Sequence, residues 1–314
     1  MILPSPSSFK EPFKYPLTWT LALLNIFIFL IIFSGASSTL ITSSLLWKPE
    51  GMLLTGRLYF QYLQTLNSTD LYQRPEWLLK MKSDDTDQME MLGSYALRDA
   101  HFLGKAESLQ FIGDEIQINE WRREIHEYLK SYRDQLLYRF GLSGMSTWPL
   151  SWITYQFSHS SWMHLLSNLV FLIVMGPAVE SLVGSFTLLL IYLIGGFAGG
   201  ACFLLLNSHG AVPMVGASAS ISALLGFYCL AERRVRVRFL YFVSPIQGQY
   251  GSIFLPTLLI IPLFLVVDLA SVWSSPEGLG GGVAHIAHLG GTFLGLSLGF
   301  IVRKLNLADN GLLR

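Results

Sequence analysis

The sequence is poor in charged side chains. Of its 314 residues only 13% are Asp, Glu, Lys or Arg, whereas 52% are hydrophobic. Ordinary soluble domains carry roughly 25% charged residues. The mean hydropathy is correspondingly high, at +0.46. This balance argues against a soluble globular protein and predicts an integral membrane protein that resides in a lipid bilayer.

The sequence also lacks a net charge and has few cysteines. Equal numbers of acidic and basic residues leave a formal net charge of zero, so there is no overall positive field to attract nucleic acid. The two cysteines, Cys202 and Cys229, both lie in apolar runs. We interpret them as small buried hydrophobic residues rather than a disulfide. No cofactor, metal site or nucleic-acid partner is predicted.

Long apolar runs dominate the remainder. After a polar segment, 1–15, the run 16–36 has the roughly 20 residues that a helix needs to cross a membrane. It is too long for the apolar part of a secretory signal and lacks a convincing cleavage site, so we expect a retained first span. Five further runs occupy 162–179, 186–206, 217–231, 253–272 and 284–302. The predicted fold class is an all-α membrane protein with six transmembrane helices.

A segment of different character, 37–150, separates the first run from the others. It holds most of the acidic residues. Within it, 109–140 has helical periodicity in places, with Trp121, Ile125 and Tyr132 on one face. We therefore expect a small, mostly helical extramembrane insert after the first span.

Basic residues predict the orientation. Three clusters fall on the same side of a six-span protein, and excess Lys and Arg mark the cytoplasmic side. Both terminal segments, 1–15 and 305–314, should then be cytoplasmic, with the insert and the loop 207–215 outside. The clusters are Lys10 with Lys14, then Arg233, Arg234, Arg236 and Arg238, and finally Arg303 with Lys304.

The fourth run is short and begins with a serine, Ser218. At a rise of about 1.5 Å per residue, 217–231 is roughly 22 Å long, less than the roughly 30 Å hydrocarbon core. Its outer end should therefore lie below the membrane surface, in a water-filled cavity. Free N–H groups and the helix dipole at Ser218 would favour an oxyanion. The alternative is a serine that only caps the helix.

Two histidines open the last run, also on the outer side. His285 and His288 are one helical turn apart. Gly291 and Gly295 follow His288 by three and seven residues, and small residues at this spacing allow close helix packing. That favours His288 as the base that a serine nucleophile needs. For either histidine alone, a structural hydrogen bond at a helix end is the alternative.

A third pair of polar residues lies near the outer end of the second run. His164 and Asn168 are four residues apart and share a helix face. Both side chains can donate a hydrogen bond to a developing oxyanion. The alternative is a polar contact between helices.

These three elements together resemble the rhomboid family of intramembrane serine proteases. The resemblance covers about residues 150–302, plus the first span by position, and extends to Glu180 at the inner end of the second run. The matching motifs are His164-x-x-x-Asn168, Gly216-Ala217-Ser218, and His288 with Gly291 and Gly295.

The resemblance implies a role for each matching residue. Ser218 would be the nucleophile and His288 the general base of a Ser-His dyad in the catalytic core, 151–304. His164, Asn168 and the Ser218 backbone N–H would form the oxyanion hole, with the Ala217 N–H as a further donor.

The resemblance also implies an activity and a location. The enzyme would cleave single-span membrane proteins near the outer membrane face without a cofactor. The fifth run would form the lateral gate for the substrate, with Trp273 near its outer end. We expect a multi-pass protein of the bacterial cytoplasmic membrane.

Departures from the family pattern keep a second hypothesis open. The family usually has glycine after the serine, where this chain has Ala219, and often a larger residue where it has Ser222. The alternative is a catalytically inert rhomboid-like protein that binds membrane clients. A transporter or channel is less compatible with the sequence, because Asp268 is nearly the only charged residue expected near mid-membrane.

Overall fold

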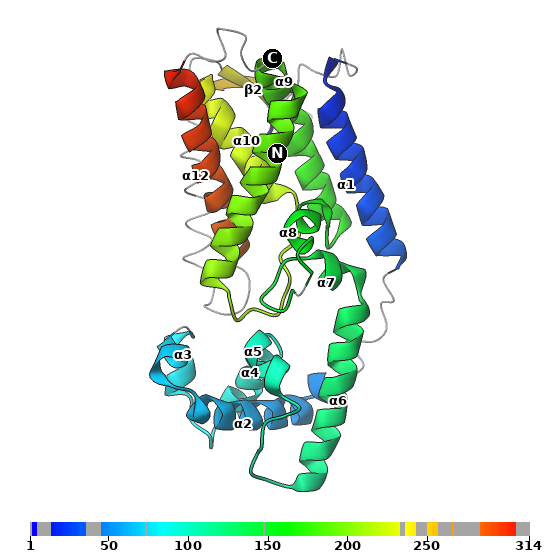
Figure 1. Cartoon of the computed structure of the whole chain (residues 1–314), viewed down its shortest axis with the longest axis vertical. Coiled ribbons are helices and arrows are strands. Elements are labelled where there is room, and N and C mark those ends of the chain that lie inside the picture. The colour runs from blue at the N-terminus through cyan, green and yellow to red at the C-terminus, as the bar shows by residue number, and fades with distance from the viewer. Residues whose placement is uncertain are drawn as a thin grey trace.

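The computed structural model describes residues 2–4, 14–35, 45–72, 74–146, 148–232, 236–242, 250–256, 266 and 283–305. This part of the chain is mostly helical, as predicted. It forms an apolar helix bundle and, beyond one end of the bundle, a smaller helical insert (Figure 1).

The bundle contains α1 (Pro16–Ser34), α9 (Trp162–Leu206), α10 (Ser218–Ala231) and α12 (Val283–Lys304). Within the described residues, α1, α9 and the 285–304 part of α12 are long and apolar enough to cross a membrane, while α10 is a shorter apolar helix. An integral membrane protein is therefore supported.

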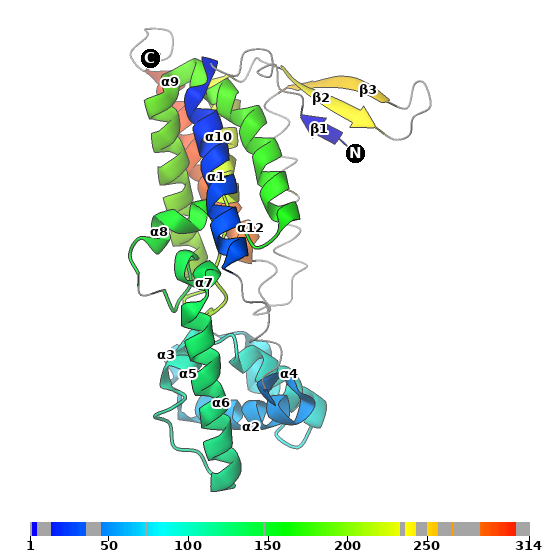
Figure 2. The ribbon, with the colours of Figure 1, turned by 90° about the vertical axis from the view of Figure 1, so that its right-hand side faces the viewer.

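Helix α9 contains both the second and the third predicted run. They are separated at Gly184, whose φ of 77° and ψ of 167° interrupt the helix. A residue with a side chain would be strained at this positive φ. Figure 2 shows the two halves of α9 running in opposite directions from this break. The predicted boundary, between 179 and 186, thus coincides with a reversal of the chain.

A small antiparallel sheet was not predicted. It contains β1 (Ile2–Pro4), β2 (Arg236–Phe242) and β3 (Tyr250–Pro256) in the order β1-β2-β3. Ile253 pairs with Phe239, so the fifth run begins as strand rather than helix. Aromatic and β-branched residues, which favour extended backbone, are frequent in both longer strands. The remainder of that run, including Asp268, lies outside the described residues except for 266, and so does Trp273. The count of six spans therefore stays a prediction.

The insert has its own hydrophobic core. Its longest helix, α6 (Glu115–Asp134), buries Trp121, Ile125 and Tyr132, as the periodicity predicted, although the helix is shorter than 109–140. The other elements are η3 (Leu45–Trp47), α2 (Pro49–Thr65), α3 (Ser68–Tyr72), η4 (Glu76–Lys80), α4 (Thr86–Ala96) and α5 (Ala100–Lys105).

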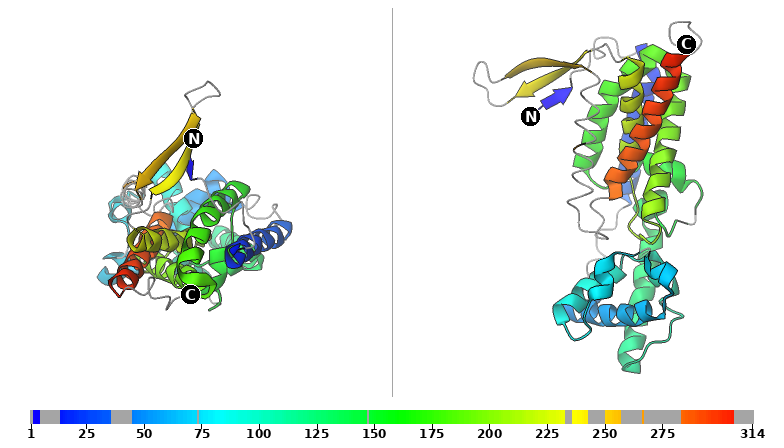
Figure 3. Two further views of the ribbon diagram at one scale, coloured as in Figure 1. Left: turned by 90° about the horizontal axis from the view of Figure 1, so that it is seen from above. Right: turned by 90° about the vertical axis from the view of Figure 1, so that its left-hand side faces the viewer.

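Three short helices connect the insert to the bundle: α7 (Leu136–Phe140), α8 (Ser151–Thr154) and η5 (Tyr155–Phe157). The insert lies at the end of the bundle away from the sheet and from the C-terminal end of α12 (Figure 3). The domain boundaries at 37 and 150 stay predictions.

A buried carboxylate attaches α1 to the bundle. Glu180 of α9 accepts hydrogen bonds from the backbone N–H groups of Leu17 and Thr18, at 3.0 and 2.9 Å. It also accepts from the hydroxyls of Thr18 and Ser185, both at 2.7 Å. Glu180 therefore provides acceptors for the first turn of α1, whose N–H groups have no partner within the helix.

Candidate functional site

Ser218 is the first residue of α10 and is half-buried. The N-cap is Ala217, and no side-chain hydrogen bond caps this helix. The alternative that Ser218 serves only as a helix cap is therefore not supported. The hydroxyl instead lies at a helix N-terminus whose N–H groups and dipole favour negative charge.

Gly216 brings the loop before Ser218 against the second predicted span. Its φ of 123° lies in the region that favours glycine. A Cβ atom added there would lie 2.7 Å from His164 Nε2 and 3.7 Å from Asn168 Nδ2. The backbone two residues before Ser218 is therefore packed directly against both of the predicted oxyanion donors.

The surroundings of His164 orient its ring. The Ser160 hydroxyl lies 3.3 Å from His164 Nδ1, while Nε2 faces Gly216. The rings of His159 and His164 meet edge to face, with centroids 5.1 Å apart. Asn168 is buried and donates from Nδ2 to the His164 carbonyl oxygen at 2.9 Å. Ser160, one turn before His164, was not predicted to take part.

Helices α10 and α12 pack with almost no space between their backbones. Three glycines of α12 face three carbonyl oxygens of α10, and both sets are spaced by four residues. Added Cβ atoms would lie 2.1, 2.0 and 2.4 Å from the oxygens in the pairs Gly291–Ala219, Gly295–Ala223 and Gly299–Phe227. These distances are far below van der Waals contact, so only glycine fits. We call this contact the glycine seam.

The glycine seam determines which residues lie at the same end of the two helices. Ser218 directly precedes Ala219, and His288 is one turn before Gly291. The rings of His285 and His288 meet edge to face, with centroids 5.5 Å apart. The structure therefore brings Ser218, His288, His164 and Asn168 to one region of the bundle.

The methyl group of Ala219 faces a glycine of α9. A Cβ added at Gly199 would lie 2.5 Å from Ala219 Cβ and 2.7 Å from the Ala287 carbonyl oxygen. Gly199 thus leaves the space that the Ala219 methyl occupies. The sequence shows the repeat of glycines at 195, 196, 199 and 200, but it does not show which helices pack against them.

The neighbouring serines have different surroundings. Ser220 is fully buried and donates to Gln156 Oε1 at 3.0 Å, which identifies it as a packing residue. Ser222 is half-buried. Gln156 also donates to the Trp152 carbonyl oxygen. Because Gln156 lies before the second span in the three-residue helix η5, no spacing in the sequence indicated its contact with α10.

Within the described residues, no group of three or more His, Cys, Asp or Glu could hold a metal ion. Cys202 and Cys229 are both free thiols.

Comparison with known proteins identifies the family. Residues 146–305, half of the chain, match the rhomboid domain. A relative from Arabidopsis thaliana, rhomboid-like protein 11, chloroplastic, is 32% identical over 161 residues, which are 50% of this chain and 54% of that protein. The chain thus spans about half the length of this curated relative. The match contains the glycine seam and all the candidate site residues, and this chain belongs to the rhomboid family.

Proposed function

We propose that this protein is an intramembrane serine endopeptidase that uses Ser218 and His288. The observation that carries the proposal is the glycine seam, because its register brings the N-terminal end of α10 and the His288 turn of α12 together. Membership of the rhomboid family supports the same activity.

The chemistry would be acyl transfer followed by hydrolysis. Ser218 Oγ attacks the scissile carbonyl carbon, and His288 accepts the hydroxyl proton. The tetrahedral oxyanion is stabilised by His164, Asn168 and the backbone N–H groups of Ser218 and Ala217. His288 then donates its proton to the leaving amine, and the acyl-enzyme remains. Water, activated by His288, releases the second product and regenerates Ser218.

The contact of His164 with Ser160 is compatible with a donor role for His164 Nε2. A hydroxyl that donates to Nδ1 favours the tautomer with the proton on Nε2. Nε2 is the nitrogen that faces Gly216, next to the N-terminus of α10. In that tautomer His164 is neutral and can still donate a hydrogen bond to the oxyanion.

A fluorophosphonate probe tests the nucleophile, because it reacts with activated serines. Wild type should be labelled, and Ser218→Ala should lose both labelling and cleavage of a single-span test substrate. Ser220→Ala is a matched control two residues along the same helix. It removes a hydroxyl bonded to Gln156 and should keep its labelling. Persistent labelling of Ser218→Ala would disprove the assignment. A folded wild type that neither labels nor cleaves would instead support the inert, client-binding alternative.

The same assay distinguishes the two histidines. His288→Ala should reduce the labelling and cleavage rates by about 10²-fold or more, as expected for loss of a general base. His285→Ala should keep most of both. The opposite result would reverse the assignment of the base.

A substitution of Gly216 tests the loop that packs against His164 and Asn168. Gly216→Ala adds a methyl group toward His164 Nε2 at a φ that disfavours alanine. We expect cleavage to fall by about 10²-fold, because small misplacements of reacting groups have effects of that order. Thermal unfolding should change far less. Gly104→Ala, which has open space around it, is the control. Unchanged cleavage by Gly216→Ala would contradict this arrangement.

The proposed substrates are single-span membrane proteins cut near the outer face. A cytoplasmic location of both termini is part of the proposal, and so is a bacterial cytoplasmic membrane. Arg303 and Lys304 close α12 at the end of the bundle away from the insert, which supports that orientation (Figure 3).

A further inference from the structure

The loop 207–216, which leads to Ser218, is bound by backbone hydrogen bonds to three segments. The insert forms the first contact, since Ala100 N–H donates to His209 O at 2.6 Å and Ala211 N–H to Arg98 O at 2.7 Å. These bonds flank an antiparallel bridge between Asp99 and Gly210. The insert thus binds the loop through its main chain.

The two other segments follow along the loop. Leu142 and Met214 exchange backbone hydrogen bonds at 3.0 and 2.7 Å, and Gly144 N–H donates to Gly210 O at 3.0 Å. Gly216 N–H then donates to Tyr155 O at 2.9 Å, two residues before Ser218. The loop is therefore held by backbone hydrogen bonds along most of its length, from His209 to Gly216.

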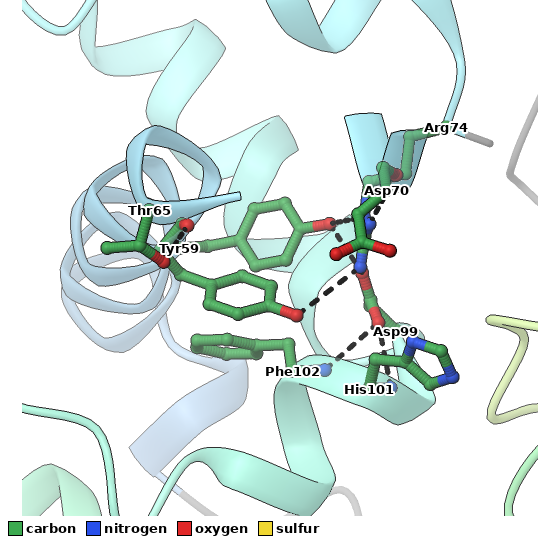
Figure 4. A network of polar contacts seen from close by, with 8 residues as sticks. Tyr59, Thr65, Asp70, Arg74, Asp99, His101 and Phe102 are labelled. Atoms are coloured by element: carbon green, nitrogen blue, oxygen red, sulfur yellow. Dashed lines mark hydrogen bonds and ion pairs between the residues drawn. The ribbon is translucent and has the colours of Figure 1, made fainter. Parts of the chain in front are cut away.

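A buried ion pair holds the insert side of this contact (Figure 4). Asp99 Oδ2 accepts from Arg74 Nη2 at 2.9 Å and from the Tyr59 hydroxyl at 2.6 Å. Asp99 Oδ1 accepts from the backbone N–H groups of His101 and Phe102, at 2.9 and 3.0 Å, and so caps α5. We call Arg74, Tyr59 and Asp99 the Asp99 cluster.

The Asp99 cluster is rigid because its charges are buried. The side chains of Arg74 and Asp99 are only 1% and 0% exposed. Burial raises the pKa of the Tyr59 hydroxyl, and the Asp99 carboxylate raises it further, so Tyr59 stays a neutral donor. Loss of either charged partner would leave the other buried and unpaired, which is strongly unfavourable. The Asp99 backbone is therefore fixed in the core of the insert.

We propose that the Asp99 cluster is a brace for the active-site loop. By fixing residues 98–100, it holds 209–211 in place and thereby the position of Gly216 and Ser218 relative to His164. Arg74 and Asp99 are positioning residues, and both lie more than 100 residues before Ser218 in the chain. This proposal rests on the proposed protease function. It differs from a role of the insert in recruiting substrates, which would not require a rigid contact with the loop.

Amide hydrogen exchange of the full-length protein in detergent tests the brace without any catalysis. The Ala211, Met214 and Gly216 amides report the three contacts. In Asp99→Asn, which keeps the size of the side chain but loses its charge, we expect these amides to exchange roughly tenfold faster or more, because local opening requires less free energy. Unchanged exchange in a folded Asp99→Asn protein would overturn the brace. If that variant does not fold, Tyr59→Phe removes the 2.6 Å hydrogen bond to Asp99 and the 3.3 Å bond from Arg74 Nε, keeps the ion pair, and should give a smaller increase.

The rate of labelling by a small fluorophosphonate distinguishes a brace from a substrate-recruiting role. The probe does not need the insert for binding. A brace predicts that Asp99→Asn slows labelling and cleavage in parallel, by roughly tenfold to a hundredfold. Slower cleavage, seen as a higher KM, with unchanged labelling would support recruitment and overturn the brace. If wild type is not labelled, the protease proposal fails, and the exchange experiment still decides whether the brace exists.

Two comparisons define the specificity of the result. Lys80 and Glu76 form an ion pair in the same insert at 3.1 Å, but their side chains are 72% and 78% exposed. Glu76→Gln should therefore leave exchange and labelling at wild-type values.

Gly144→Ala displaces the loop from the other side, since its Cβ would lie 2.2 Å from Ser208 O, and it leaves the Asp99 cluster intact. Gly144→Ala should also increase the rate of amide hydrogen exchange at Met214. An effect of Gly144→Ala without any effect of Asp99→Asn would show that the insert is not the brace.

Discussion

Gly291→Ala is expected to reduce cleavage strongly and to lower the thermal stability of the protein. The added Cβ would lie 2.1 Å from the Ala219 carbonyl oxygen, which belongs to the backbone of α10 and cannot rotate away. The two helices would have to separate, next to Ser218 and one turn from His288. Overpacking of a core typically costs about 1–3 kcal/mol, and the displacement of reacting groups should reduce cleavage by about 10²-fold or more.

Thermal unfolding and the labelling rate of Ser218 measure the two effects. Gly104→Ala is the control, because alanine there meets open space. Gly299→Ala provides a graded comparison. It faces the Phe227 carbonyl oxygen at 2.4 Å, two turns farther from the site, and should reduce stability with a smaller effect on labelling. A Gly291→Ala protein with wild-type activity would show that the glycine seam does not position Ser218 and His288.

Glu180→Ala should release the N-terminal end of α1 from the bundle. The carboxylate accepts four hydrogen bonds, from the N–H groups of Leu17 and Thr18 and from the hydroxyls of Thr18 and Ser185. Hydrogen bonds to charged groups contribute about 1.5–3 kcal/mol each, and buried donors without an acceptor are unfavourable. We therefore expect a large fall in unfolding temperature, together with proteolysis near Pro16.

The side chain at 180 also allows a graded test. Glu180→Gln keeps one acceptor oxygen but presents an NH₂ group to other donors, so its unfolding temperature should lie between those of wild type and Glu180→Ala. Ser181→Ala is the matched control, since the exposed Ser181 hydroxyl donates to the Ala178 carbonyl oxygen of its own helix. If Glu180→Ala unfolds at the wild-type temperature, the carboxylate does not hold α1 in place.

Local patterns in the sequence predicted much of the candidate site. His164 and Asn168 share a helix face at a spacing of four, and His288 stands one turn before Gly291. Ser218 begins a run too short to cross the bilayer. Each of these inferences depends only on helix periodicity and on the cost of polar groups in hydrocarbon, which neighbouring residues along the chain reveal.

Other contacts could not be read from the chain. The space for Ala219 depends on Gly199, and the orientation of His164 depends on Ser160. Ser220 is hydrogen-bonded to Gln156, whose three-residue helix η5 is too short to give a periodic pattern. The β2–β3 pair was missed for a related reason. Its second strand continues into an apolar run that, by length and composition, resembles a transmembrane helix.

By itself, the sequence determined the membrane character of this protein, the order of its apolar helices and the candidates for its chemistry. Composition and periodicity are properties of a single segment and its solvent, so they need no partner. Only the tertiary structure decided the register of α10 against α12 and the contact of the Asp99 cluster with the loop before Ser218. Both depend on which backbones can approach one another, and a glycine or a buried charge acquires its role only from the segment that packs against it.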